Sequence, residues 1–166
     1  VESVVRESDD VVSVTLRGRR LDRLDPLPGQ FFNWRFLSGP GWTRAHPYSL
    51  SAAPTGERMR ITVKDLGDGS RALADVKPGT RVLIEGPYGR LHPGVRTQRK
   101  VTLMASGIGI TPMRSLLEGL PQGPGDVTLL YRARSEADLV LSPELDELSL
   151  RTGARVVYLP GRRLAG

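Results

Sequence analysis

The stretch Arg44-Ala45-His46-Pro47-Tyr48-Ser49-Leu50-Ser51 brings an aromatic ring, serine hydroxyls and basic groups together within eight residues. This mixture suits a ligand with a flat ring and a negatively charged tail. Tyr48 can pack on the face of a ring, and Ser49 can donate a hydrogen bond to a ring oxygen. His46 or Arg44 can lie near a pyrophosphate. The alternative is an ordinary β-strand after a proline turn, and the stretch alone does not decide between the two.

The overall composition narrows the kinds of site that the chain can carry. The net charge is +6 over 166 residues, mostly from arginine, and acidic residues are interleaved along the chain. This distribution favours a solvated surface over nucleic-acid binding, and we predict no nucleic-acid partner. The chain has no cysteine, which excludes a thiol nucleophile and a cysteine-ligated iron–sulfur cluster in this chain. With only two histidines, His46 and His92, we predict no metal site.

The hydropathy pattern predicts no membrane span. No apolar run approaches the ~18 residues that a spanning helix needs, and no signal peptide is visible at the start of the chain. We therefore predict a cytoplasmic location. The chain starts at Val1, directly in a strand-like pattern, so we expect it to be a piece of a longer protein.

Residues 1–98 are predicted to form a small antiparallel β structure. Short valine-rich, alternating or aromatic runs predict strands at residues 1–5, 11–16, 31–37, 58–63 and 81–85, separated by turns rich in Gly and Pro. A short helix is predicted at residues 70–74. Many short strands with regular turns are typical of an antiparallel barrel or sandwich.

A second motif, Gly67-Asp68-Gly69-Ser70, follows the strand that ends at Val63 and Lys64. It combines free backbone N–H groups, a hydroxyl and the start of a short helix, and a helix start attracts phosphate through its N–H groups and its dipole. A plain Asp-Gly turn explains the same four residues equally well.

Residues 99–166 follow a different pattern, which predicts a parallel α/β nucleotide-binding domain. Apolar strands are expected at residues 101–105, 127–131 and 154–159, with helices at 111–120 and 142–150 between them. Only three strands fit before the chain stops at Gly166, so we expect this domain to be truncated. The chain thus divides into domains at 1–98 and 99–166.

The third motif, Ser106-Gly107-Ile108-Gly109-Ile110-Thr111-Pro112, lies between a buried strand and a helix. Gly107 and Gly109 permit a tight turn and close approach of a ligand to the backbone, and the helix start faces an anionic group. Glycine-rich turns also occur without function, but this strand–loop–helix context favours a dinucleotide site.

A fourth basic segment ends the second parallel strand at Tyr131-Arg132-Ala133-Arg134-Ser135. In dinucleotide-binding folds this position meets the adenosine ribose, where an acid suits NAD and an arginine suits the extra phosphate of NADP. Arg132 and Arg134 therefore predict NADPH as the electron donor, with NADH as the alternative. An ordinary basic loop is the competing interpretation.

The four segments, in this order and spacing, resemble the ferredoxin–NADP reductase superfamily. Its flavin motif Arg-x-Tyr-Ser/Thr is similar to His46-Pro47-Tyr48-Ser49, and its Gly-x-x-Ser/Thr motif is similar to Gly67-Asp68-Gly69-Ser70. Residues 106–112 resemble its nicotinamide loop, and Gly86-Pro87-Tyr88-Gly89 resembles its Gly-Pro-x-Gly turn. The histidine in place of the motif arginine, and the run from Val63 to Asp68, are similar to the NADPH oxidase and ferric reductase branch.

The resemblance implies a flavin-binding antiparallel β-barrel followed by the truncated nucleotide domain. The parent would pass a hydride from NAD(P)H to FAD and then single electrons to a separate acceptor. Ser49, near the reactive edge of the flavin, and Thr111, between nicotinamide and flavin, are the implied catalytic residues. The implied cofactor-binding residues are His46, Pro47, Tyr48, Ser49, Val63, Lys64, Gly67, Gly69, Ser70, Gly107, Gly109, Thr111, Pro112, Arg132 and Arg134.

Three interpretations of the function stay open at this point. The branch resemblance implies an acceptor in an upstream membrane haem domain, which would make the chain the cytosolic domain of a membrane protein. A soluble flavin reductase that serves a partner protein or an iron chelate fits the same motifs. A non-catalytic FAD-binding module is the third, because the nucleotide domain is incomplete.

Overall fold

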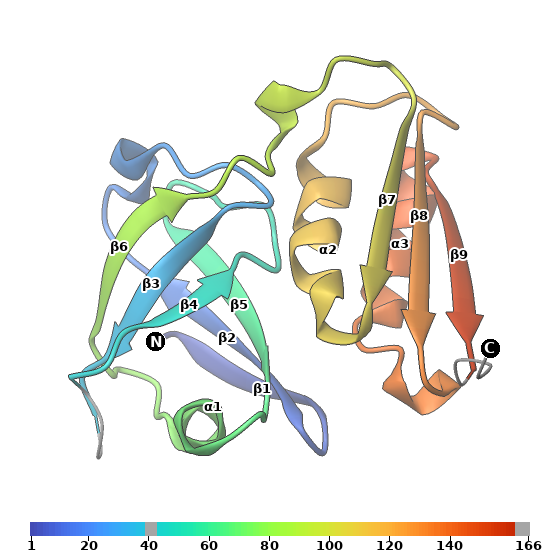
Figure 1. The fold of residues 1–166 in the computed structure, drawn as a ribbon. Helices are drawn as coiled ribbons and strands as arrows, with labels where there is room; N and C mark the ends of the chain where they lie inside the picture. The colour runs from blue at the N-terminus through green and yellow to red at the C-terminus, as the bar shows by residue number, and fades with distance from the viewer. Residues whose placement is uncertain (39–42, 162–166) are drawn as a thin grey trace.

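A computed structural model describes residues 1–38 and 43–161. The chain forms an antiparallel β unit, containing strands β1 to β6, and an α/β unit, containing strands β7 to β9 (Figure 1). Each unit has its own hydrophobic core, and the two cores share no residue. No helix in the described part of the chain is long and apolar enough to cross a membrane.

The β unit consists of two three-stranded antiparallel sheets, in the orders β1-β2-β5 and β4-β3-β6. The strands are β1 (Ser3–Ser8), β2 (Val11–Arg17), β3 (Phe31–Phe36), β4 (His46–Ser49), β5 (Arg58–Lys64) and β6 (Val82–Tyr88). Alternation along β3 buries Phe32, Trp34 and Phe36 against the inner residues of β2 and β5. The predicted strands are thus confirmed, with boundaries that shift by a few residues.

The predicted β-barrel is not closed in the structure, because its strands form two separate sheets. β4 and β5 are the facing edge strands of the two sheets, and only an isolated bridge between Leu50 and Ile61 joins them. On the other side, β6 begins only at Val82, and the backbone of Val1 meets Gly79 and Thr80 just before that strand. Neither contact extends into a continuous ladder of hydrogen bonds, so the barrel is not closed. We call the gap between β4 and β5 the open seam.

The β6 strand also differs from the prediction. We expected a Gly-Pro turn to follow a strand ending at residue 85, but β6 continues through Gly86 and Pro87 to Tyr88. The Gly86–Pro87 peptide bond is cis, and a Cβ atom at Gly86 would lie 2.6 Å from Cδ1 of Phe32. Glycine at this position therefore lets the strand pass close to the buried Phe32 ring.

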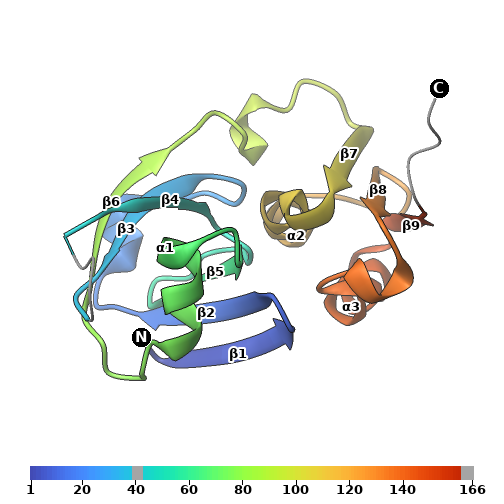
Figure 2. The same cartoon turned by 60° about the horizontal axis from the view of Figure 1, so that its bottom comes forward.

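The α/β unit is a parallel sheet, as predicted, and its strand order is β7-β8-β9. Its elements are β7 (Val101–Ser106), α2 (Ile110–Gly119), β8 (Val127–Ala133), α3 (Ser142–Thr152) and β9 (Arg155–Pro160). Both helices cover the same face of the sheet (Figure 2), as right-handed crossovers require. The core between them includes Leu103, Leu117, Leu129 and Leu145.

Short helices make up several connections between these elements. The β unit contains α1 (Asp68–Arg71), which the sequence predicted a little later, and the adjoining η2 (Ala72–Asp75). The other single-turn helices are η1 (Leu21–Leu24), η3 (Pro93–Val95), η4 (Gly107–Gly109) and η5 (Glu136–Asp138). The η4 turn joins the end of β7 to the start of α2.

Candidate functional site

The first two predicted motifs meet at the open seam of the β unit. The His46 ring, on β4, lies so close to α1 that a Cβ atom at Gly69, within that helix, would be 2.7 Å from His46 Cε1. The same ring stacks on Tyr48, with ring centroids 6.0 Å apart and planes inclined by 16°. Any side chain at position 69 would displace His46, so the glycine is required for this contact.

Tyr48 and Ser49 carry the polar groups of β4. The Tyr48 carbonyl accepts a hydrogen bond of 2.9 Å from the Trp34 indole N–H, which fixes the strand against the core. Burial raises the pKa of the Tyr48 hydroxyl, so this group remains a donor at neutral pH. The Ser49 hydroxyl is half-buried and has no hydrogen-bond partner among the described residues. Pro47, between them in the motif, is exposed.

The loop from Gly67 to Ser70 is held mainly by its own hydrogen bonds. The Ser70 hydroxyl donates to the Gly67 carbonyl (2.9 Å) and accepts from the Leu66 N–H (2.8 Å). The Gly67 N–H donates to an Asp65 carboxylate oxygen at 3.1 Å. The Ser70 side chain therefore shapes the turn, and its contact with a phosphate stays a prediction.

The two predicted residues at the end of β5 have different surroundings. The Val63 side chain is 4% exposed and belongs to the core, so Val63 can offer a ligand only its backbone. Lys64 Nζ lies 2.9 Å from Oδ2 of Asp10 in a partly exposed ion pair. Lys64 also lines a cavity that reaches the α/β unit.

The glycine-rich loop at the end of β7 leaves its backbone accessible. Gly107 has a φ of +53°, which favours glycine, and a Cβ atom at Gly107 or Gly109 would meet nothing within 4 Å. Pro112 lies in the first turn of α2, as predicted. Thr111 is only 6% exposed, and its hydroxyl donates to the Ile108 carbonyl at 3.2 Å. Thr111 thus stabilises the start of α2 in this structure.

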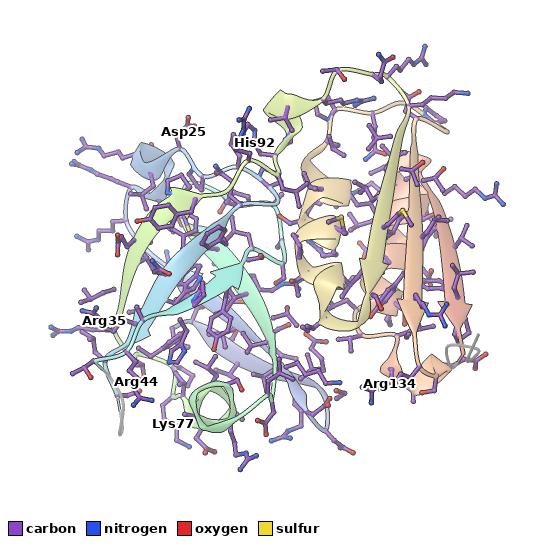
Figure 3. All side chains as sticks on the ribbon, in the orientation of Figure 1. Asp25, Arg35, Arg44, Lys77, His92 and Arg134 are labelled. Atoms are coloured by element: carbon purple, nitrogen blue, oxygen red, sulfur yellow. The ribbon has the colours of Figure 1, made fainter. Side chains whose placement is uncertain are left out.

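A cavity of about 260 Å³ brings predicted residues from both units together. Lys64, Gly107 and Arg134 line it. Figure 3 shows Arg134 just past the end of β8. Arg132 is exposed as well but is not part of the lining, so the structure separates the two candidate arginines. The remaining lining residues are Val11, Leu66, Ser106, Ile108, Ala133, Asp138 and Val140.

A larger cavity, of about 590 Å³, lies elsewhere in the β unit and contains none of the predicted residues. It is lined by apolar side chains such as Leu16, Trp34 and Met59 and by the backbone that precedes β6. Size therefore does not identify the site. In the described part of the chain, no group of three or more His, Cys, Asp or Glu side chains is arranged to hold a metal ion.

The residues that join the two units were not predicted from the sequence. Arg60 on β5 and Glu144 on α3 form an ion pair, and Ser115 on α2 binds the backbone beyond β4. Arg60 and Glu144 lie far apart in the sequence, so no local pattern relates them. The only local signal was the spacing of Arg114 and Glu118, which pair one helical turn apart.

Comparisons with known proteins show that the chain is similar in sequence to an oxidoreductase NAD-binding domain and to ferredoxin reductase components. Residues 103–164 match the family described as oxidoreductase NAD-binding domain. The ferredoxin reductase component of 3-ketosteroid-9-alpha-monooxygenase from Mycolicibacterium smegmatis is 35% identical over 96% of this chain and 48% of its own. The ferredoxin–NAD(+) reductase component of the alkene monooxygenase system from Xanthobacter autotrophicus is 38% identical over 78% of this chain and 40% of its own.

A solved structure matches both units. The flavohem-like FAD/NAD binding domain of nitric oxide dioxygenase from Vibrio cholerae gives a TM-score of 0.79 at 28% identity, covering 99% of this chain and 78% of that chain. The chain spans less than half the length of the two curated relatives. The comparisons confirm that the chain is related to FAD- and NAD(P)H-dependent oxidoreductases of the ferredoxin reductase type. They do not test the NADPH oxidase and ferric reductase branch.

The residues of β4 and of the glycine-rich loop fit the two predicted nucleotides, FAD and NAD(P)H. On the β side, the Tyr48 ring and the unpaired Ser49 hydroxyl lie together on β4 beside the open seam. On the α/β side, the accessible backbone of Gly107 and Gly109 leaves room for a phosphate to approach. Lys64 and Arg134 add positive charge to the cavity between the two sides.

Proposed function

We propose that this chain, which carries a ferredoxin reductase-type NAD-binding domain at residues 103–164, is the FAD- and NAD(P)H-binding part of a flavin-dependent oxidoreductase. The observation that carries the proposal is the packing of His46 on Gly69, which joins the two flavin motifs into one site. We divide the chain into a FAD-binding domain at residues 1–98 and a nucleotide-binding domain from residue 99.

In this proposal the residues of β4 hold the flavin. Bound FAD would supply the redox chemistry, taking a hydride from NAD(P)H and passing electrons on singly. Tyr48 packs on the ring system, and the Ser49 hydroxyl donates to its reactive edge. His46 and the backbone of the Gly67–Ser70 turn bind the pyrophosphate region.

The α/β unit binds the electron donor. The accessible backbone at Gly107 and Gly109 admits the dinucleotide, with Pro112 setting the first turn of the helix behind the loop. The Thr111 hydroxyl, through its bond to Ile108, keeps the loop in place beside the flavin. Arg134 is the better placed of the two arginines to pair with a ribose phosphate, because it lines the cavity.

The electron acceptor is a separate redox group. Both relatives are named as reductase components of monooxygenase systems, which supports an acceptor on another protein. The membrane haem acceptor, the ferric reductase-like activity and the cytoplasmic location stay predictions. The first two rest on the resemblance of His46-Pro47-Tyr48-Ser49 to one branch of the superfamily, and the location rests on the hydropathy pattern, which predicts no membrane span.

The function is tested by mixing FAD-loaded protein with NADPH or NADH without oxygen and following the flavin absorbance. We expect bleaching, and faster bleaching with NADPH because Arg134 can pair with its extra phosphate. Arg134→Ala should lower the NADPH selectivity roughly ten- to a hundredfold, the equivalent of losing a charged hydrogen bond. Arg132→Ala is the matched control and should leave selectivity nearly unchanged.

Two outcomes would contradict these statements separately. A flavin that stays oxidised with both donors, while FAD remains bound, would leave only a flavin-binding module. Equal or faster reduction by NADH in the unmodified protein would contradict the NADPH preference alone. The name of the Xanthobacter relative, a ferredoxin–NAD(+) reductase, makes this second comparison a demanding one.

A further inference from the structure

The two units are joined by hydrogen bonds between the loop after β4 and helix α2. Ser115 Oγ donates to the Ala52 carbonyl at 2.9 Å, and the Ala53 N–H donates to Glu118 Oε2 at 2.6 Å. The backbone of Gly119 also lies close to the ring of Pro28, since a Cβ atom at Gly119 would be 2.3 Å from Cγ of Pro28. The loop that follows β4, the proposed flavin-binding strand, is thus hydrogen-bonded directly to α2, the helix that follows the glycine-rich loop at Gly107 and Gly109.

Four charged side chains reinforce this junction. Arg60 from β5 binds Glu144 of α3 through two hydrogen bonds, of 2.7 and 2.8 Å. Arg114 of α2 places its Nε 2.8 Å from Oε2 of the same carboxylate, the oxygen that Arg60 Nη2 also contacts, and it also pairs with Glu118. We call Arg60, Arg114, Glu118 and Glu144 the clasp. Each of the three elements β5, α2 and α3 contributes to it.

The clasp is more buried than an ordinary surface ion pair. The Arg114 and Arg60 side chains are 9% and 17% exposed. Burial pushes the pKa of the Glu144 carboxyl upward, but hydrogen bonding and charge attraction from Arg60 and Arg114 outweigh it and lower the pKa. Glu144 therefore stays ionised at neutral pH, and its carboxylate pairs with both Arg60 and Arg114.

A buried hydrogen-bond chain anchors the clasp in the β unit. Arg60 Nε donates to Ser51 Oγ at 3.1 Å, and Arg60 Nη2 donates to the Ser51 carbonyl at 3.0 Å. Ser51 Oγ also accepts from Thr62 at 2.8 Å, and Thr62 lies 2.7 Å from the Ser13 hydroxyl of β2. The β unit thus holds the guanidinium of Arg60 in position, and the same guanidinium bonds to Glu144 of the α/β unit.

The position of the clasp in the sequence links it to both proposed reaction partners. Ser51 follows Ser49 by two residues, and Arg114 follows Thr111 by one helical turn. Any movement of α2 relative to β4 would shift Thr111 relative to Ser49. Reactions between two bound groups depend steeply on such shifts, because a 1 Å misplacement can cost roughly a hundredfold in rate.

We propose that the clasp is a positioning device that sets the orientation of the two units for hydride transfer, with Arg60 and Glu144 as positioning residues. The transfer part of this statement rests on the proposed function; the orientation part does not. Buried ion pairs contribute little net stability compared with apolar packing. A fixed orientation therefore explains the retention of four charges at this junction better than stability does.

The orientation is measured directly with two spin labels, one on each unit. Because the chain has no native cysteine, the pair Asp9→Cys and Glu147→Cys labels two exposed sites, one on the β1–β2 turn and one on α3. Pulsed electron resonance should give one narrow distance distribution in this background. Adding Glu144→Gln should broaden or shift it, because Arg60 loses its charged partner and Arg114 loses one of its two.

The matched control is Arg58→Met. Arg58 lies two residues from Arg60 on the same strand and binds Glu2 through two hydrogen bonds of 2.7 and 2.9 Å within the β unit. Its loss should leave the distance distribution unchanged. An unchanged distribution in Glu144→Gln would overturn the orientation role. Should Glu144→Gln fail to fold, Glu144→Asp, which keeps the charge but shortens the reach, provides the same comparison.

Flavin reduction is measured in the same variants. Glu144→Gln should bind FAD as tightly as the unmodified protein but reduce it roughly ten- to a hundredfold more slowly at saturating NAD(P)H. Glu144→Asp should recover part of the rate. An unchanged rate with a broadened distance distribution would overturn the transfer role. A protein that binds no FAD at all would contradict the proposed function, while the distance measurement would still decide on the orientation.

Discussion

Replacing Trp34 with alanine is expected to destabilise the β unit by about 3–5 kcal/mol. The Trp34 side chain is fully buried and packs beside Phe32, with ring centroids 5.5 Å apart. The substitution would leave a large cavity and would also remove the indole N–H that donates to the Tyr48 carbonyl. Urea unfolding followed by circular dichroism measures the loss in the free energy of unfolding.

Trp34→Phe serves as the control for this measurement. It keeps an aromatic ring in the core and removes chiefly the hydrogen bond to Tyr48, so a smaller loss is expected. A loss below about 1 kcal/mol for Trp34→Ala would contradict the core that the structure describes, because large-to-small changes at well-packed sites exceed that value. It would also contradict the role of Trp34 in fixing β4 against the core.

Replacing Tyr48 with alanine is expected to weaken FAD binding by roughly 1–3 kcal/mol, about five- to a hundred and fifty-fold in Kd. The ring is half-buried, stacks on His46 and belongs to the strand that carries Ser49. Its removal would take away both the surface for the flavin ring and the support for His46. Titration of the apoprotein with FAD, followed by flavin fluorescence, measures the change.

Tyr48→Phe separates the ring from the hydroxyl in this experiment. Because the phenolic group has no hydrogen-bond partner among the described residues, the phenylalanine variant should bind FAD nearly as well as the unmodified protein. Equal affinities for the alanine variant and the unmodified protein, with both folded, would show that the flavin does not pack on this ring.

The local features of the fold were predictable from the sequence because they depend on local patterns. The aromatic run at β3 and the continuous apolar runs at β7 and β8 predicted strands that the structure contains. The meeting of His46 with Gly69 was not visible in either motif, but the resemblance placed both at one cofactor. The local Gly-Pro signal failed in β6, where contacts with Phe31 and other residues of β3 extend the strand to Tyr88.

Most of the features that the sequence did not predict depend on contacts between distant segments. Closure of the barrel needs hydrogen bonds between β4 and β5, and the chain turns from β4 toward α2 before such a ladder forms. The pairing of Arg60 with Glu144 joins residues that are 84 positions apart. The Ser70 hydroxyl suggested a phosphate ligand from its motif, yet its hydrogen bonds to Gly67 and Leu66 depend on how the turn folds.

The central claim, that His46 to Ser49 and Gly67 to Ser70 form one flavin site, is tested most directly by FAD binding to the unmodified protein. FAD fluorescence is recorded as increasing amounts of folded apoprotein are added. We predict quenching that saturates at one FAD per chain, and a loss of that saturation in a Gly69→Val variant, whose side chain would displace the His46 ring. Unchanged FAD fluorescence with the protein in large excess, in a sample that circular dichroism shows to be folded, would contradict the claim.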